Sequence, residues 1–354
     1  MPRRHTPIEL LRFVLSLSVV AYHYFYFGPS IAAVPGTPVV TAVPFLLLAV
    51  ETFFIVSGFV IMFSASGRSG AEFAVARFAR LGPTLFACST LTYLVLGLFP
   101  LHYGAPALNQ WAASVLVLPL AVHDGVDASL WSLKYEIVFY VLIFAVLSAG
   151  LTRRRITWLA WGLVVSDLLF AAGGTGGGPS WWPMGHYGAF FALGMLYYLR
   201  SSGAKGLAPI WLAAGAMALV DCRLELWRVE AQLLGHGMPA LATSILAGAV
   251  AIGAFFGFAG APEIPVLARA FTLLGSASYP LYVVHQFLGY RIITWACGAT
   301  GLGPTLVKLG VMGFMVSFAL AFTVLIERPL MDEYWWFGRR LARILHPAAA
   351  EQPR

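Results

Sequence analysis

Two ionisable residues interrupt the apolar run at the start of the chain. The run covers residues 8–27, and its length of about 20 residues suffices to cross the hydrocarbon core of a bilayer. Arg12 and His23 lie close to three helical turns apart, so their side chains fall on nearly one face, about 16 Å from each other along the axis. A cation in a membrane helix costs about 2.5–3.5 kcal/mol and therefore usually faces a bundle interior or a polar cavity. Taken alone, the pair also fits an arginine that reaches the headgroups and a histidine at the far interface.

The composition places most of the chain in lipid. Of the 354 residues, 60% are hydrophobic and only 10% are charged, which is too few to cover the surface of a soluble protein. The net charge of +7 fits the basic cytoplasmic loops of a membrane protein, so it needs no nucleic acid as a partner. The three cysteines form no CxxC or Cys/His cluster, which indicates neither a metal site nor a disulfide framework.

The apolar segments predict an all-α, polytopic integral membrane protein with about 10 transmembrane helices. With the N-terminus inside, alternate counting leaves most of the 22 Lys and Arg residues in inner segments, and only Arg223 and Arg228 in outer ones. That asymmetry predicts that both termini are cytoplasmic. The predicted spans are 8–27, 43–64, 82–100, 131–149, 156–172, 185–200, 206–221, 239–259, 271–292 and 304–326.

Three other segments complete the predicted organisation. Residues 106–121 are apolar but short and bracketed by prolines, so we expect an interfacial or re-entrant helix on the outer side. We expect the glycine cluster 173–182 to form a flexible outer loop, and the stretch after Glu327 to lie along the inner surface. Residues 1–345 are taken as a single transmembrane domain and 346–354 as a short cytoplasmic tail.

Polar residues also mark the second predicted span. Glu51 lies near its start, where a deeply placed carboxylate requires a partner, and we expect Arg12 or His23 of the neighbouring helix to supply it. For the Ser57-Gly58 pair that follows, we favour close helix packing over a role in chemistry.

Basic and acidic residues recur around the third and fourth predicted spans. Arg77 and Arg80 fall in the inner loop before the third span, three residues apart on one helix face. This spacing suits several contacts with phosphates, and it also suits cations that set topology. Glu136 lies in SLWSLKYEIVFY, residues 129–140, whose aromatic residues also fit an interface belt.

The last two spans carry the remaining candidates. Tyr282 and His285 lie about one helical turn apart in SASYPLYVVHQF, toward the outer half of the ninth span. Glu327 precedes Arg328 and Pro329 at the end of the last span, where proline stops a helix, so we expect Glu327 to have a capping role.

The order and separation of these motifs resemble the bacterial integral-membrane acyltransferase-3 family. The resemblance rests on ELLRFVLSLSVVAYH, ETFFIVSGFVI, RFAR, SLWSLKYEIVFY, SYPLYVVH and the terminal ERP, and it extends over the whole chain. It implies an acyl-CoA donor, with acetyl-CoA as the default, on the cytoplasmic side of a bacterial inner membrane. The implied acceptor is a hydroxyl of a surface glycan, a lipid-linked sugar or a secreted natural product.

The resemblance also assigns roles to residues and shows two differences. It associates Arg77 and Arg80 with the donor, and Arg12 and His23 with transfer. The tryptophan-led motif carries Lys134 where we expect a small or polar residue. The soluble esterase-like domain that follows in some members is not seen, so we expect a stand-alone transferase.

Moving an acyl group from a thioester to a hydroxyl requires a base for the hydroxyl proton and positive charge or hydrogen-bond donors near the oxyanion. Histidine suits the first role, so we expect His23 to be the general base, or to carry the acyl group transiently. We expect Glu51 or Glu136 to orient the site, and Arg12 to hold the donor or the oxyanion.

The pair His285 and Tyr282 is the second candidate for proton handling. No metal is expected, because the chain shows no metal cluster, and it shows no nucleophile elbow that would favour hydrolysis.

Two other classes of function compete with acyl transfer. A secondary transporter or exporter of a small anion or glycan would also place Arg, His and Glu within the membrane. The lack of a visible internal repeat and the basic pair of the inner loop count against it. A structural membrane subunit is the third alternative, and the several polar clusters make it the weakest.

Overall fold

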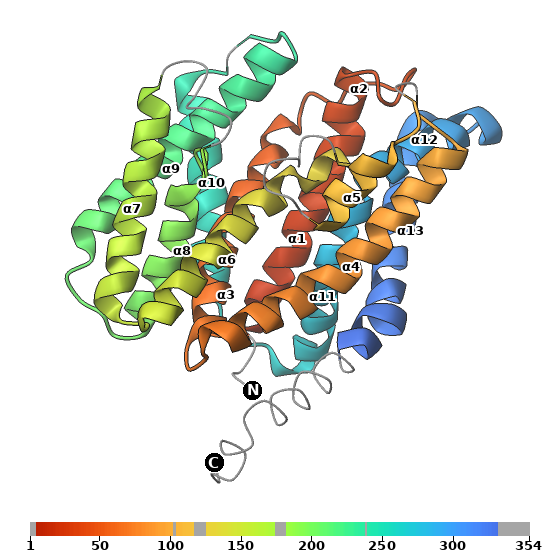
Figure 1. The fold of residues 1–354 in the computed structure, drawn as a ribbon. Helices are drawn as coiled ribbons and strands as arrows, with labels where there is room; N and C mark the ends of the chain where they lie inside the picture. The colour runs from red at the N-terminus through yellow and green to blue at the C-terminus, as the bar shows by residue number, and fades with distance from the viewer. Residues whose placement is uncertain (1–4, 102–103, 117–124, 174–181, 238, 332–354) are drawn as a thin grey trace.

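The computed structural model of the chain is a bundle of helices (Figure 1). It describes residues 5–101, 104–116, 125–173, 182–237 and 239–331. The α-helices are α1 (Thr6–Tyr22), α2 (Gly28–Ser30), α3 (Ala49–Ala65), α4 (Gly70–Leu98), α5 (Leu108–Leu116), α6 (Trp131–Ala149), α7 (Arg153–Ala172), α8 (Gly188–Ser201), α9 (Ala208–Trp227), α10 (Leu241–Ala259), α11 (Ala268–Val284), α12 (Gln286–Thr300) and α13 (Pro304–Phe322). Turns of π-helix form η1 (His23–Phe27), η5 (Arg228–Leu233) and η7 (Thr323–Glu327), and 3-10 turns form η2 (Pro44–Leu48), η4 (Ala128–Leu130) and η6 (Pro265–Leu267).

The all-α class is confirmed, and the helices indicate a multi-pass membrane protein. Each of the ten predicted spans contains helix, and the described residues include seven stretches that are long and apolar enough to cross a bilayer. The predicted ranges 185–200, 206–221 and 271–292, which are not among the seven, fold as α8, α9 and the α11–α12 pair. The seven stretches are Thr6–Ser30, Pro44–Ala65, Gly70–Leu98, Ala128–Ala149, Arg153–Ala172, Leu241–Ala259 and Pro304–Met331.

Contacts between connecting segments agree with the predicted alternation of the spans. At one end, the backbone N–H of Thr6 donates to Glu263 Oε1 (3.0 Å). Arg153 Nη2 donates to the carbonyl of Ser202 (2.7 Å). Each of these contacts joins two segments that the sequence places on the same, inner side. Which end faces the cytoplasm stays a prediction.

The basic pair Arg77 and Arg80 lies within a helix and not in the predicted inner loop. Helix α4 begins at Gly70 because Ser69 and Glu72 form a capping box, in which each side chain accepts the other's backbone N–H. The helix therefore starts about two turns before Arg77. Both guanidinium groups are consequently held on a rigid element.

The ninth predicted span is not one helix. Helix α11 ends at Val284 and α12 begins at Gln286, so the chain bends at His285. Pro280 lies inside α11, where it lacks the N–H that would otherwise bond to the preceding turn. The two helices meet at a corner, which we call the His285 corner.

Some predicted segments are described only in part. Of the predicted interfacial or re-entrant segment 106–121, the structure describes α5, whose 9 residues make about 14 Å of helix, so its interfacial placement stays a prediction. Residues 117–121 of that segment, most of the glycine cluster (174–181) and the tail after residue 331 lie outside the described residues.

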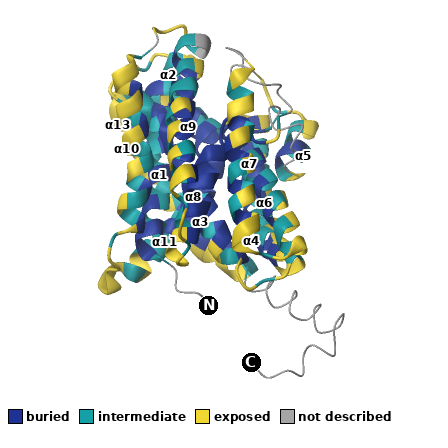
Figure 2. Ribbon diagram, turned by 90° about the vertical axis from the view of Figure 1, so that its left-hand side faces the viewer, coloured by how far each residue is buried: buried dark blue, intermediate teal, exposed yellow. Residues whose placement is uncertain are grey.

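Helices α3 and α8 form the buried centre of the bundle (Figure 2). They approach so closely that a Cβ on Gly58 would lie 2.2 Å from the carbonyl oxygen of Phe191. A Cβ on Gly194 would lie 2.1 Å from the carbonyl oxygen of Ile55. The close packing predicted for Gly58 is confirmed, and through it α3 and α8 form one rigid unit.

We expect Gly58→Ala to destabilise the protein, because its Cβ would meet backbone atoms that cannot move without separating α3 from α8. The purified variant should unfold several degrees below the parent in a thermal scan. Gly253→Ala in α10 is the matched control: its Cβ meets no atom within 4 Å, so its melting temperature should stay or rise. Equal melting temperatures for both variants would contradict the close packing.

Candidate active site

His23 and His285 meet across two elements that are far apart in the sequence. The Nε2 atom of His285 lies 2.9 Å from Nδ1 of His23, and the ring centroids are 4.9 Å apart. His285 is fully buried and His23 is half-buried. The structure thus joins the two candidates for proton handling into one pair.

The neighbours of this pair define where the protons sit in the neutral state. Nδ1 of His285 lies 2.8 Å from the carbonyl of Tyr282, and a carbonyl only accepts, so Nδ1 of His285 donates and its Nε2 accepts. Nδ1 of His23 lies 3.0 Å from the carbonyl of Val19 and 2.9 Å from the accepting Nε2 of His285, so it carries a proton as well. His23 therefore keeps its lone pair on Nε2, which forms no hydrogen bond with the described residues.

Irregular backbone brings the two rings together. Helix α1 passes at His23 into the π turn η1, closed by the bond from the Gly28 N–H to the His23 carbonyl. The hydroxyl of Tyr24, in the same turn, donates to the carbonyl of His285 (2.7 Å). Gly289 of α12 has room for no side chain, since a Cβ there would lie 1.9 Å from the Tyr24 hydroxyl. The π turn is thereby fastened to the His285 corner.

Asp127 fixes the other side of the His285 corner. Its Oδ2 accepts from the Phe287 N–H (2.9 Å), which α12 leaves unbonded at its start, and its Oδ1 accepts from the N–H and the hydroxyl of Ser129. Burial raises the pKa of Asp127 to about 6, against the lowering effect of these hydrogen bonds. The carboxylate ties the start of α12 to η4, just before α6.

A polar pocket lies between α1, α3, α4, α6 and α11. Its empty volume is about 830 Å³, part of it open to the outside. Among the predicted site residues it is lined by Arg12, Arg77, Arg80, Glu136 and Tyr282, and it also exposes the hydroxyl-bearing residues Ser57, Ser132, Ser278, Tyr140 and Tyr279. Glu51, His23 and His285 are not part of its lining, although the carbonyl of Tyr282 binds His285.

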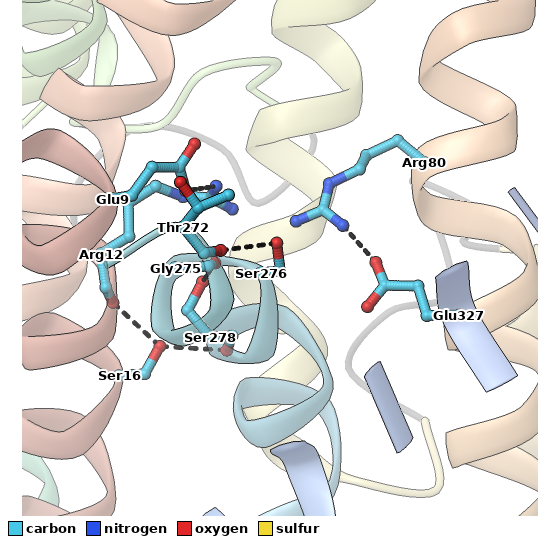
Figure 3. A network of polar contacts seen from close by, with 9 residues as sticks. All are labelled: Glu9, Arg12, Ser16, Arg80, Thr272, Gly275, Ser276, Ser278 and Glu327. Carbon is cyan, nitrogen blue, oxygen red and sulfur yellow. Dashed lines mark hydrogen bonds and ion pairs between the residues drawn. The ribbon is translucent and has the colours of Figure 1, made fainter. Parts of the chain in front are cut away.

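The three arginines of the pocket have different partners, and two of them, Arg12 and Arg80, are paired with carboxylates (Figure 3). Arg12 forms an ion pair with Glu9 of its own helix (3.1 Å). Arg80 forms an ion pair with the buried Glu327, across the bundle. Glu327 therefore does more than the capping that the sequence suggested: it is the counter-charge of Arg80.

Arg77 lines the pocket and forms no ion pair with a carboxylate among the described residues. Its Nη2 donates to the hydroxyl of Ser64 (2.8 Å), and its guanidinium lies over the rings of Phe73 and Tyr140, at 5.6 and 5.8 Å. Its buried Nε has no hydrogen-bond partner among the described residues. An unpaired, buried N–H of a guanidinium is a position where an anionic ligand can bind.

The expected partner of Glu51 is not found. Arg12 pairs with Glu9 and His23 with His285, while Glu51 lies close enough to Glu225 and Arg228 to interact electrostatically with both. Glu136 instead faces the pocket, where its Oε1 accepts from Tyr140 (2.7 Å) and Ser57 (3.3 Å). Of the two acids predicted to orient the site, the geometry thus favours Glu136.

Tyr282 is a fixed element of the pocket wall. Its hydroxyl lies 2.7 Å from the hydroxyl of Ser132 and 3.0 Å from the carbonyl of Ser129, to which it donates. Its own carbonyl accepts from His285. Tyr282 therefore connects the pocket to the histidine pair.

A second polar cluster was not assigned a role from the sequence. The carboxylate of Glu225 accepts from Arg228 (2.5 and 3.0 Å), and its Oε2 lies 3.0 Å from Nε2 of His186. The hydroxyl of Tyr187 lies 3.3 Å from the same oxygen. Glu225 lies in the last turn of α9 and Arg228 begins η5, whereas His186 and Tyr187 directly precede α8. In the sequence, this cluster was signalled by the concentration of charged residues in the stretch 222–238.

This cluster adjoins the histidine pair through aromatic rings. Tyr22 packs edge-on against His23 (5.3 Å between centroids). It also packs at a tilt against Tyr26 (5.8 Å), whose hydroxyl donates to Glu230. The ring of Tyr187 packs at a tilt against that of Tyr135 (4.6 Å between centroids). Buried carboxylates and aromatic rings therefore occur together next to His23.

Comparison with protein families matches residues 7–328, almost the whole chain, to the acyltransferase 3 family, described as an acyltransferase domain. Comparisons with curated proteins and with solved structures found no match. The match covers the histidine pair, the pocket and its three arginines, and it confirms the resemblance drawn from the motifs. The chain belongs to the acyltransferase 3 family of membrane acyltransferases.

Proposed function

We propose that the protein is an O-acyltransferase of the bacterial cytoplasmic membrane. Its donor is an acyl-CoA, with acetyl-CoA as the default, and it binds from the cytoplasmic side. Its acceptor is a hydroxyl of a surface glycan, a lipid-linked sugar or a secreted metabolite. The observation that carries this proposal is the pocket lined by three arginines, whose wall ends at the residue that holds the His285–His23 pair.

The histidine pair suits the proton transfer that the reaction requires. The acceptor oxygen attacks the thioester carbonyl, a C–O bond forms and the C–S bond breaks. The hydroxyl proton passes to Nε2 of His23 and then to the leaving sulfur, which departs as the free thiol. During this step His23 carries two N–H groups, and the accepting Nε2 of His285 holds the one on Nδ1. His285 therefore acts as an orienting group, in the way a carboxylate orients the histidine of a hydrolase triad.

Arg12 suits the donor and not the oxyanion. It lies about 16 Å from His23 along α1, farther than its side chain reaches. The guanidinium faces the same pocket as Arg77 and Arg80, and phosphate groups are the donor chemistry that three guanidiniums recognise. We assign all three to the phosphate-bearing part of acyl-CoA.

The acceptor fits the opposite side of His23. The Glu225 and Glu230 carboxylates can accept hydrogen bonds from sugar hydroxyls, and the rings of Trp131, Tyr135 and Tyr187 pack on one another and form an apolar wall. The two acids belong to a predicted outer stretch and the three rings to the outer ends of predicted spans, so donor and acceptor would approach His23 from opposite ends of the bundle. This arrangement supports transfer to a molecule outside the cytoplasm.

We expect His23→Ala to lower kcat by about 100- to 10,000-fold, because general-base catalysis is lost. His285→Ala should lower kcat less and leave the KM for acyl-CoA unchanged, because it removes the acceptor that orients His23. His285→Gln keeps an acceptor oxygen and should recover part of that loss. Steady-state kinetics on purified protein measures these values. Equal kcat values for His285→Gln and His285→Ala would contradict the orienting role.

Arg77→Gln and Arg80→Gln should have different effects. Arg77→Gln removes a guanidinium that has no carboxylate partner among the described residues. It should weaken acyl-CoA binding at least tenfold, with little loss of thermal stability. Arg80→Gln leaves the buried Glu327 unpaired, which costs about 3–5 kcal/mol, so it should lower the melting temperature. Adding Glu327→Gln to Arg80→Gln should restore much of that stability. A double variant as unstable as Arg80→Gln would show that the ion pair does not explain the loss.

The function itself is tested by mass spectrometry of surface glycans and secreted metabolites from cells with and without the protein. A mass gain of one acyl group that depends on His23 supports the proposal and identifies both the group and the acceptor. An unmodified product in the wrong compartment would instead favour a transporter.

A further inference from the structure

A second, larger groove lies away from the candidate active site. It is bounded by the end of α8, the start of α9 and the side of α10, and its empty volume is about 1290 Å³, open to the surface. It shares no lining residue with the pocket of the three arginines. The residues that matter for its chemistry are Tyr197, Arg200, Lys205, Trp211, Leu212 and Phe256.

The floor of the groove is aromatic and rigid. The ring of Phe256 lies 5.5 Å from that of Trp211 and 5.9 Å from that of Tyr197. The hydroxyl of Tyr197 donates to the carbonyl of Ala259 (3.0 Å), which holds α8 against α10. These rings are fixed before any ligand arrives, so binding costs little side-chain entropy.

The groove continues into the lipid-facing surface. Leu212, at its edge, is 75% exposed, one of the highest values among the large apolar residues. In a helix of a multi-pass membrane protein, such an exposed apolar side chain faces acyl chains. A ligand in the groove can therefore extend its apolar part into the bilayer without crossing water.

The charged residues of the groove are all cations. Arg200 and Lys205 are exposed, and neither side chain forms a hydrogen bond or an ion pair with the described residues. No carboxylate lines the groove. Arg153 binds the carbonyl of Ser202 in the same connection, which adds a third cation near the mouth. The mouth is thus an anion-binding rim above an apolar floor.

The rim lies at the level where headgroups are expected. The connection between α8 and α9 contacts the start of α7, and both segments are placed on the inner side by their basic residues. Tryptophan at position 211 fits the same boundary between headgroups and acyl chains. Basic sites between helices on this side of a membrane suit acidic lipid headgroups.

We infer that this groove binds an anionic phospholipid of the inner leaflet. The phosphate lies between Arg200 and Lys205, and an acyl chain lies over Trp211 and Phe256 toward Leu212. Bound there, the lipid braces α8 against α9 and α10. Helix α8 packs on α3 through Gly194, and α3 lines the candidate active site, so the lipid stabilises the scaffold of that site.

The test uses the full chain, purified in detergent and titrated with dioleoyl phosphatidylglycerol or dioleoyl phosphatidylcholine while native mass spectrometry counts bound lipids. We expect the first phosphatidylglycerol to bind at least tenfold more tightly than phosphatidylcholine. Arg200→Gln with Lys205→Gln should abolish this preference. Arg269→Gln with Arg328→Gln, which removes two exposed cations elsewhere on the same predicted side, should preserve it.

A second variant fills the groove and leaves its two cations in place, so it tests the shape of the site apart from its charge. Ala208→Trp places a large ring among the lining residues and keeps both cations, so it should also weaken phosphatidylglycerol binding at least tenfold. Undiminished binding to Ala208→Trp, or equal loss in the two double variants, would overturn the proposal in favour of general attraction to a basic surface. Equal affinity for the two lipids would overturn it as well. These readouts do not depend on acyl transfer.

Discussion

The contact between the π turn η1 and the His285 corner is the constraint on which the candidate site depends. Both segments depart from regular helix, and a polar group left unbonded in a membrane interior costs several kcal/mol. Side-chain hydrogen bonds join the two segments: Tyr24 donates to the carbonyl of His285, which also accepts from the Gly289 N–H, and the two histidine rings bind each other. Asp127 satisfies the first free N–H of α12. The hydrogen bonds that bring the two histidine rings together are therefore accompanied by bonds that fasten η1 and η4 to the start of α12.

Much of the fold was predictable because apolar runs and charge asymmetry are local properties of the sequence. The same holds for Arg12 and His23, which both lie on the side of α1 that faces α11 and its corner, as their spacing predicts. The pairing of His23 with His285 was not predictable, since it joins residues 262 positions apart and requires the chain to bend at His285. Pro280, inside the predicted span, was the available sign of that bend.

The charge partners were harder to predict than the charges. Arg12 pairs with Glu9 within one turn of its own helix and not with Glu51 as expected, and Arg80 pairs with Glu327 across 247 positions. A buried charge must be paired, but which residue pairs with it depends on helix rotation and packing. Glu51 illustrates this dependence: its neighbours are Glu225 and Arg228, from a stretch whose polarity alone was visible.

The distribution of these partners determines how the pocket can recognise a polyanion. A guanidinium has five donor N–H groups, so a carboxylate that takes one or two fixes its orientation and leaves the others free. The carboxylate also cancels most of the positive charge, as at Arg12 and Arg80. Arg77 has only a hydroxyl and ring faces as partners among the described residues, so its charge is uncompensated. In the proposed function, Arg77 supplies the net attraction for the phosphates of the donor, and the two paired arginines supply direction.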